Sequence, residues 1–355
     1  ERPWQDTPSV YGPIASASQL LANLLGGESM HDIVFWLQLA CVVPFVVVGA
    51  VLVKLAHGDV ERQARAVLFT VCNPLLIWAV VAGAHNEALT LVFAVCALAF
   101  VRRSPFATGV FIGLAGAVKV SLVFYGLALA WGYRREPRKL AGLVAGAAVP
   151  LAIAYGLVAP QALFAASRNL GYISQGSWGL PVVYVLEFAL GGELARAVVT
   201  KIGWALLLVV AWMLSRVIGW EPVPGARVPA RDDPLTIAVR TALVLCAAWV
   251  ITTPWSLPWY DLIAWAPLAL VAPNRLSRLL MWRGASLSVA HVTARSVQFG
   301  PEMQSATWLL REVLCSVVQV GVLAAIVWWW AAAGHELPTR DGVRRGWARV
   351  REAWA

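Results

Sequence analysis

Two polar groups interrupt long apolar stretches of this chain and are suited to chemistry on a charged substrate. His85, Asn86 and Glu87 stand together between two apolar segments, and Lys119 lies inside another. An imidazole can serve as a base or donate to phosphate, and a carboxylate can serve as a base. The alternative reading of the His-Asn-Glu turn is a simple helix start, which Asn and Glu both favour.

Lys119 has a sharper interpretation than the His-Asn-Glu turn. A charge within an apolar helix is costly to bury and therefore marks a functional position. An ammonium group binds phosphate as a point charge. The alternatives are a side chain that reaches an interface or one that pairs with a buried acid.

A third polar segment combines aromatic rings with a carboxylate. Trp255, Trp259, Tyr260 and Asp261 follow one another closely. Aromatic faces stack on sugars, and a carboxylate accepts hydrogen bonds from hydroxyls. The alternative for each ring is an anchor at the membrane interface. Tyr11, in a Tyr-Gly-Pro turn, adds another aromatic group of the same kind.

The composition places these groups in a membrane protein. The chain has 355 residues, of which 60% are hydrophobic and 13% charged, whereas soluble proteins carry roughly a quarter charged residues. The net charge of +9 comes from short basic clusters between apolar segments, a pattern that encodes membrane topology rather than nucleic-acid binding. The five cysteines lie in apolar runs without metal-binding spacing.

The pattern of apolar segments predicts an all-α, polytopic transmembrane helical bundle of about 9–11 membrane helices. Residues 1–31 are expected to form a partial extracytoplasmic loop with an interfacial helix, since the chain begins with Glu1 and a polar, proline-rich stretch. Residues 32–338 form the predicted transmembrane domain, and residues 339–355 a basic cytoplasmic tail. We therefore expect the sequence to be incomplete at its N-terminus.

Basic clusters on both sides of residues 106–132 predict a hairpin of two short helices that turns near Lys119, because a single crossing would place one cluster outside. A long outer loop is expected at 159–195, and it carries Arg168. Further crossings are expected at 259–272 and, weakly, at 284–300. Arg275, Arg278 and Arg283 would lie between them on the inner side. With this topology the polar groups gather on the outer side of the membrane.

Four stretches, in order, resemble those of actinobacterial polyprenol-phosphate-mannose-dependent α-1,6-mannosyltransferases, which are integral-membrane (GT-C type) glycosyltransferases. Trp4–Pro13 is similar to their W-x-D-T-P-x-x-Y-G-P stretch, and Ala84–Leu89 to their G-H-N-D-A-L helix start. Gly116–Ser121 resembles their lysine-containing apolar helix, and Pro258–Tyr260 their P-W-Y stretch. Glu87 stands where that family has aspartate.

The resemblance implies a GT-C-like fold in the plasma membrane with an active site on the extracytoplasmic side. It implies a polyprenyl-phosphate sugar donor, with mannose as the expected sugar, and a glycan or glycolipid acceptor. Asp6, His85 and Glu87 are then the candidate catalytic residues, although in the family an acidic motif also precedes the Trp-Asp-Thr-Pro stretch. The candidate substrate-binding residues are Tyr11, Asn86, Lys119, Arg168, Trp255, Trp259, Tyr260 and Asp261.

Cofactor use stays open. No Asp-x-Asp pair and no histidine cluster supplies metal ligands, yet many GT-C relatives need a divalent cation.

A transporter or flippase would also use a buried lysine and a broken helix, but the sequence shows no internal repeat. An acyltransferase would need a catalytic histidine, for which His291 is a poor candidate.

Overall fold

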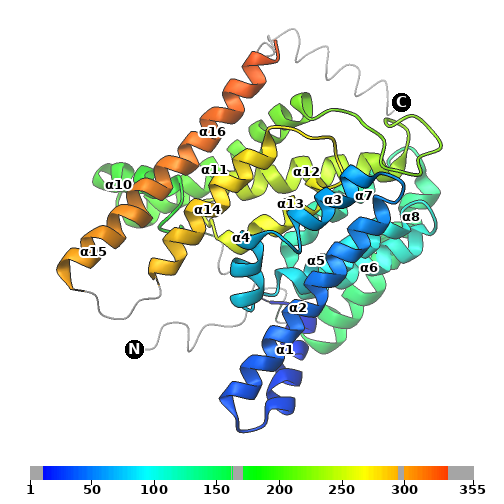
Figure 1. Cartoon of the computed structure of the whole chain (residues 1–355), viewed down its shortest axis with the longest axis horizontal. Helices are drawn as coiled ribbons and strands as arrows, with labels where there is room; N and C mark the ends of the chain where they lie inside the picture. Colours follow the sequence, from blue (N-terminus) through cyan, green and yellow to red (C-terminus); the bar gives the residue numbers. More distant parts are fainter. Residues whose placement is uncertain (1–10, 161, 163–170, 295–299, 335–355) are drawn as a thin grey trace.

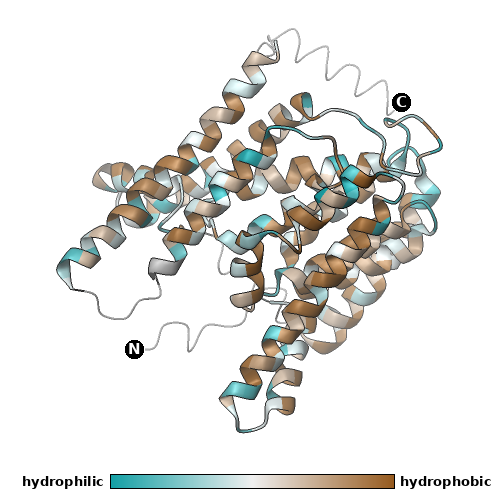
Figure 2. Ribbon diagram, viewed as in Figure 1, coloured by the Kyte–Doolittle hydropathy of each residue, from teal (hydrophilic) through white to brown (hydrophobic). Residues whose placement is uncertain are grey.

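The computed structural model describes residues 11–160, 162, 171–294 and 300–334, and within them the chain is built of helices without any strand (Figure 1). This confirms the all-α prediction. Hydrophobic residues dominate the helices, and hydrophilic residues concentrate in the connecting loops and at helix ends (Figure 2). Such a distribution is stable where lipid surrounds the bundle.

Six helices of the described residues are long and apolar enough to cross a membrane. The protein is therefore a multi-pass membrane protein, as the apolar composition indicated. The six segments are Met30–Leu55, Val60–Ala82, Pro137–Val158, Gly192–Val217, Pro234–Thr252 and Pro301–Ala332.

The N-terminal part of the bundle begins with α1 (Pro13–Gly26), where an interfacial helix was expected, and α1 packs against α2 (Met30–Leu55). The next crossing comprises α3 (Val60–Phe69), α4 (Pro74–Leu76) and a π-helical turn, η1 (Ile77–Ala82). The helices α5 (Glu87–Phe100), α6 (Pro105–Val118) and α8 (Pro137–Leu151, continued by η3, Ala152–Val158) then pack side by side.

The C-terminal part packs around α12 (Pro234–Thr252), which is buried on nearly all sides. It contacts α7 (Val123–Gly132), α11 (Gly192–Val217) and α13 (Leu262–Leu268). Farther out lie α10 (Gly179–Leu190), α14 (Leu276–Ala294), α15 (Pro301–Trp308), η6 (Leu309–Leu314) and α16 (Cys315–Ala332) (Figure 1).

The predicted hairpin near Lys119 is confirmed. α6 ends at Val118, a short 3₁₀ turn, η2 (Val120–Leu122), follows, and α7 returns. Both ends of the hairpin meet the same loop: Arg102 forms an ion pair with Asp233 at 2.8 Å, and Arg135 lies 3.4 Å from Asp232. The two basic clusters therefore lie on one side of the bundle.

Asp233 is also the cap of α12, since its side chain accepts a hydrogen bond from the Thr236 backbone at 2.8 Å. Burial acts to raise the pKa of the Asp233 carboxyl, but its hydrogen bonds with Arg102 and Thr236 outweigh burial and lower the pKa below its usual value. One carboxylate thus joins the start of α12 to the start of the hairpin.

Three expected boundaries are corrected by the structure. The 159–195 loop contains the helix α10. The crossing at 259–272 is only a 3₁₀ turn, η5 (Pro258–Asp261), and the short helix α13. Because α13 is buried entirely in protein, its length need not match the bilayer. The helix expected at 284–300 begins earlier, at Leu276, so Arg278 and Arg283 lie within α14 rather than in an inner loop.

Glycines bring α6 and α8 into backbone contact. A Cβ atom on Gly109 would lie 2.1 Å from the Leu143 carbonyl oxygen, and one on Gly146 would lie 2.1 Å from that of Phe106. Small residues at a helix interface let two backbones approach closely, which is how helices associate in lipid.

We predict that Gly146→Ala lowers the melting temperature of the detergent-solubilised protein, because the methyl group would force α6 and α8 apart at a cost of about 1–3 kcal/mol. Gly321→Ala in α16 is the matched control, since a Cβ atom on Gly321 would meet no neighbouring atom of the described residues within 4 Å. That control should keep or raise the melting temperature, because alanine favours helix. An equal fall in the melting temperature of both variants would contradict a tight contact between α6 and α8.

Candidate active site

The His-Asn-Glu segment follows a strained turn. The π-helical turn η1 ends at Ala82, and Ala84 then adopts a φ of 51°, the left-handed region that favours glycine. His85 and Asn86 complete the turn, and α5 begins at Glu87. Strain of this kind persists only where the surroundings fix it, and it is frequent at functional sites. The turn sends Glu87 into the bundle, where its exposed fraction is 1%.

Lys119 lies at the break between α6 and η2 and points to the same place. Its exposed fraction is 9%, and its ammonium group forms an ion pair with the Glu87 carboxylate. The ammonium nitrogen lies 4.4 Å from the centre of the Tyr260 ring and 5.5 Å from that of Tyr11. Ring faces attract a cation at these distances. Four chain segments thus supply one site.

Other segments donate hydrogen bonds to the last carbonyls of α6 at the break, where the Ala115 carbonyl also accepts a hydrogen bond from the Lys119 backbone N–H at 3.0 Å. The Thr90 hydroxyl donates to the Ala115 carbonyl at 2.9 Å, and Tyr155 donates to Gly116 at 2.9 Å. The Gly12 backbone donates to Val118 at 2.8 Å. A broken helix is tolerated in a membrane only when its polar backbone is satisfied in this way.

The Tyr11-Gly12-Pro13 turn is therefore part of the site. A Cβ on Gly12 would lie 2.1 Å from the Ala117 carbonyl oxygen, so only glycine allows this approach. The contact places the Tyr11 ring beside Lys119. Burial raises the pKa of the Tyr11 hydroxyl, and the charge of Lys119 opposes part of that rise. Tyr11 therefore stays protonated at neutral pH and can donate a hydrogen bond.

The aromatic segment forms the opposite wall. The His85 ring stacks on Trp259 with 3.5 Å between centres, and His291 meets the same indole edge-on at 4.8 Å. The Trp255 indole donates to the Tyr260 hydroxyl at 2.9 Å. The Pro258–Asp261 turn thus connects the His-Asn-Glu segment with the aromatic rings near Lys119.

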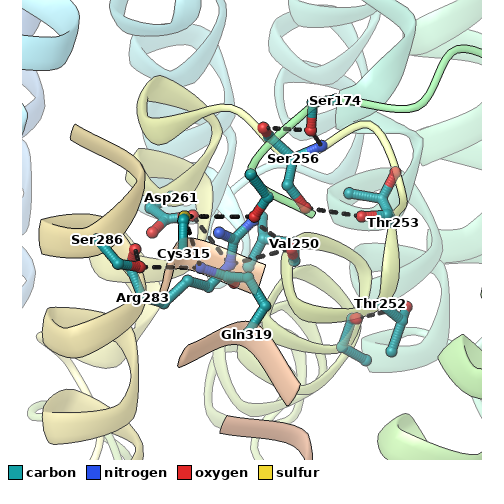
Figure 3. A network of polar contacts seen from close by, with 12 residues as sticks. Ser174, Val250, Thr252, Thr253, Ser256, Asp261, Arg283, Ser286, Cys315 and Gln319 are labelled. Carbon is teal, nitrogen blue, oxygen red and sulfur yellow. Dashed lines mark hydrogen bonds and ion pairs between the residues drawn. The ribbon is translucent and has the colours of Figure 1, made fainter. Parts of the chain in front are cut away.

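Asp261 points away from this group, toward α14. Its carboxylate lies 3.5 Å from the Arg283 guanidinium, and both side chains are buried (Figure 3). Arg283 also donates to the Val250 carbonyl of α12 at 3.0 Å. Cys315 and Gln319 of α16 lie next to the pair (Figure 3). Arg283 therefore fixes the Pro258–Asp261 turn against α12 and α14.

An apolar cavity of about 380 Å³ lies beside the site, between α7 and α11. Val120 and Ser121, which directly follow Lys119, line one end. Trp249 and Trp255 line it as well, and both contact Tyr260. Tyr260 thus contacts both Lys119 and two residues of the cavity wall.

The structure brings together most of the residues selected from sequence. Tyr11, Glu87, Lys119 and Tyr260 form one group, and His85, Trp259 and Trp255 adjoin it. Asn86 is nearly buried at the start of α5. Asp6 and Arg168 lie outside the described residues. The described residues contain no group of three or more His, Cys, Asp and Glu side chains that could hold a metal ion.

Two residues that lie next to the candidate site, Arg283 and His291, were not predicted from the sequence. Arg283 was assigned to an inner basic cluster with Arg275 and Arg278, although its position well inside an apolar helix was a detectable signal. His291 was set aside as a poor candidate for acyl transfer, and it lies against Trp259.

Comparison with known proteins identifies one matching family. A family described as "Alpha-(1->6)-mannopyranosyltransferase, N-terminal domain" matches residues 1–134, which include the His-Asn-Glu turn and Lys119. The chain resembles the α-1,6-mannosyltransferases of actinobacteria. No solved structure matches it significantly.

Three curated relatives carry this resemblance. A probable α-(1→6)-mannopyranosyltransferase of Mycolicibacterium smegmatis is 27% identical over 60% of this chain and 36% of its own length. The α-(1→6)-mannopyranosyltransferase B of Corynebacterium glutamicum is 27% identical over 42% of this chain and 29% of its own. An α-(1→6)-mannopyranosyltransferase of Mycobacterium tuberculosis is 27% identical over 68% of this chain and 42% of its own length. The chain thus spans less than half the length of each relative.

We predict that Arg283→Met destabilises the protein by about 3–5 kcal/mol, because it leaves the Asp261 charge buried and unpaired. The double variant Asp261→Leu/Arg283→Met should lose less stability than Arg283→Met, since no charge stays buried. Thermal unfolding in detergent compares the two. A double variant that is less stable than Arg283→Met would show that the pair itself is not the relevant interaction.

Proposed function

We propose that the protein transfers mannose from a polyprenyl-phosphate donor to a glycan or glycolipid acceptor on the extracytoplasmic side of the plasma membrane. The central observation is Lys119, a buried cation at a helix break, next to an apolar cavity. The names of the relatives support mannosyl transfer. The donor class and the membrane side rest on the arguments below.

The cavity and Lys119 together match an amphipathic donor. The isoprenoid chain would occupy the apolar cavity between α7 and α11, where Phe124 and Leu207 contribute apolar walls. Its phosphate would then reach Lys119 past Val120 and Ser121. Tyr260, which touches both the cavity wall and Lys119, lies where the apolar and charged parts of the donor would meet.

The hairpin supports the proposed side of the membrane. Its two ends carry the basic clusters that meet Asp232 and Asp233, and its turn carries Lys119. Basic loops stay in the cytoplasm. The Lys119 turn therefore faces the other side, and the site takes its substrates there.

The reaction would be a displacement at the anomeric carbon. An acceptor hydroxyl attacks that carbon, its oxygen–carbon bond forms, and the bond to the phosphate oxygen breaks with release of polyprenyl phosphate. A carboxylate takes the hydroxyl proton. Lys119 stabilises the negative charge that develops on the leaving phosphate. The Tyr11 hydroxyl, which stays protonated, can donate to the same group.

Glu87 and Asp6 are the proposed bases. In the structure Glu87 is bound to Lys119. A donor phosphate at Lys119 would compete with that carboxylate and free it to accept the proton. Asp6, close in sequence to Tyr11, is the alternative. We assign His85, which stacks on Trp259, and Asn86 to the binding of sugar hydroxyls.

We predict that Lys119→Met lowers mannosyl transfer by about 100-fold or more, the size expected for loss of an electrostatic stabiliser of the leaving group. Lys119→Arg should retain part of the activity, because it keeps the charge. Transfer is measured in membranes with radiolabelled polyprenyl-phosphate mannose and an oligomannoside acceptor.

Lys201→Met, an exposed lysine of α11, is the matched control and should behave as wild type. Equal transfer by Lys119→Met and wild type would refute the phosphate role. No transfer by wild type from any polyprenyl-phosphate sugar, together with solute uptake into vesicles, would favour a transporter instead.

We predict that Thr200→Trp, which fills the apolar cavity from α11, raises the KM for a long-chain donor more than for a ten-carbon analogue. The longer isoprenoid depends on more of the cavity. Leu208→Trp is the control, because that side chain is 69% exposed on the same helix and does not line the cavity. An equal effect on both donors would argue against a lipid-chain site there.

A further inference from the structure

A second cavity, of about 510 Å³, lies at the inner end of the bundle and is lined almost entirely by charged side chains. We infer that it binds the phosphate head group of an anionic lipid from the cytoplasmic leaflet. Its lining residues are Arg134, Arg135, Arg216, Trp220, Arg231 and Asp232. This inference rests on the membrane orientation proposed above but not on the catalytic role of Lys119.

The cavity has an excess of positive charge that the described residues do not balance. Four of its lining side chains are guanidinium groups and one is a carboxylate. Asp232 lies 3.4 Å from Arg135, and the neighbouring Asp233 is bound to Arg102 and Thr236. Within the described residues, Arg216 and Arg231 have no carboxylate within 4 Å, and both contact aromatic rings instead. Like charges held this close favour an anion between them.

Ring contacts and hydrogen bonds hold part of the cavity wall in place. Trp220 lies between Arg231, 5.7 Å from its ring centre, and Arg240, 4.1 Å away. Arg240 is buried and donates hydrogen bonds to the carbonyls of Ser215, Ile218 and Gly219, which end α11. Arg134 donates to the Trp131 carbonyl at 2.7 Å.

The position of the cavity indicates a lipid rather than a free solute. Arg134 follows the end of α7, and Arg216 lies in the last turn of α11, a candidate membrane span. Trp131, half exposed, and Trp212 lie beside these two arginines, as interfacial tryptophans do. Basic pockets between membrane helices on this side suit anionic head groups, which guanidinium groups bind in a bidentate manner.

The cavity is separate from the Lys119 site. The ten residues of α7 lie between them, a rise of about 15 Å. A lipid bound here would join the ends of α7 and α11, the same two helices that flank the apolar cavity on the opposite side.

The test uses the purified protein in a neutral detergent, with phosphatidylglycerol and phosphatidylcholine as probes. Native mass spectrometry measures the lipid retained, and the melting temperature measures stabilisation. Wild type should retain phosphatidylglycerol preferentially. The variant Arg216→Gln/Arg231→Gln should bind it at least about tenfold more weakly, given roughly 1 kcal/mol for each arginine at the head-group level.

Arg138→Gln/Arg227→Gln is the matched control, because it removes the same charge from exposed positions on the same side that do not line the cavity. It should bind phosphatidylglycerol within about twofold of wild type, well below the cavity effect. The inference would be overturned if the cavity variant bound phosphatidylglycerol as well as wild type, or if both variants lost this binding equally.

A further measurement distinguishes a lipid head group from a soluble phosphate. Inorganic phosphate and glycerol phosphate should displace phosphatidylglycerol only weakly, because they lack the acyl chains that lie along α7 and α11. Displacement by either soluble compound at concentrations similar to those of the lipid would show a solute site and overturn the lipid assignment.

Discussion

The ion pair between Lys119 and Glu87 is the interaction around which the rest of the structure is arranged. Two charges removed from water are stable only when they meet and when polar groups surround them. The pair therefore requires α5 to start, and α6 to end, at the same depth. It also draws in Tyr11 and Tyr260 from distant parts of the chain. The strained turn at Ala84 and the break after Val118 both serve to bring these two side chains together.

Breaking α6 creates a second requirement, because the carbonyls at a helix end need hydrogen-bond partners within a membrane. Hydrogen bonds from Thr90, Tyr155 and the Gly12 backbone meet that requirement. The Tyr-Gly-Pro turn, far from Lys119 in sequence, is thus a structural part of the helix end. These contacts fix the backbone around Lys119 in the absence of any ligand.

Much of this could be predicted from the sequence, and the reasons are specific. The basic residues beside 106–132 predicted the hairpin, because a charge rule needs no knowledge of packing. The cost of burying Lys119 identified it as a candidate. Its partner could not be chosen, since Glu87 is 32 residues away and only packing of α5 on α6 brings the two together. Arg283 was misplaced because neighbouring arginines suggested a loop, whereas the buried Asp261 balances its charge inside the bundle. The resembling family has glycine where this chain has Ala84, and the positive φ there gives the physical reason.

The glycine contacts between α6 and α8 bear on how a bulky lipid could enter and leave. Two helices joined backbone to backbone cannot slide or separate without losing that contact along its whole length, so this flank is a fixed support. The gap between α7 and α11 is lined by larger side chains around an existing cavity, and rotamer changes can widen it. Exchange of the proposed donor with the bilayer would then favour the side between α7 and α11.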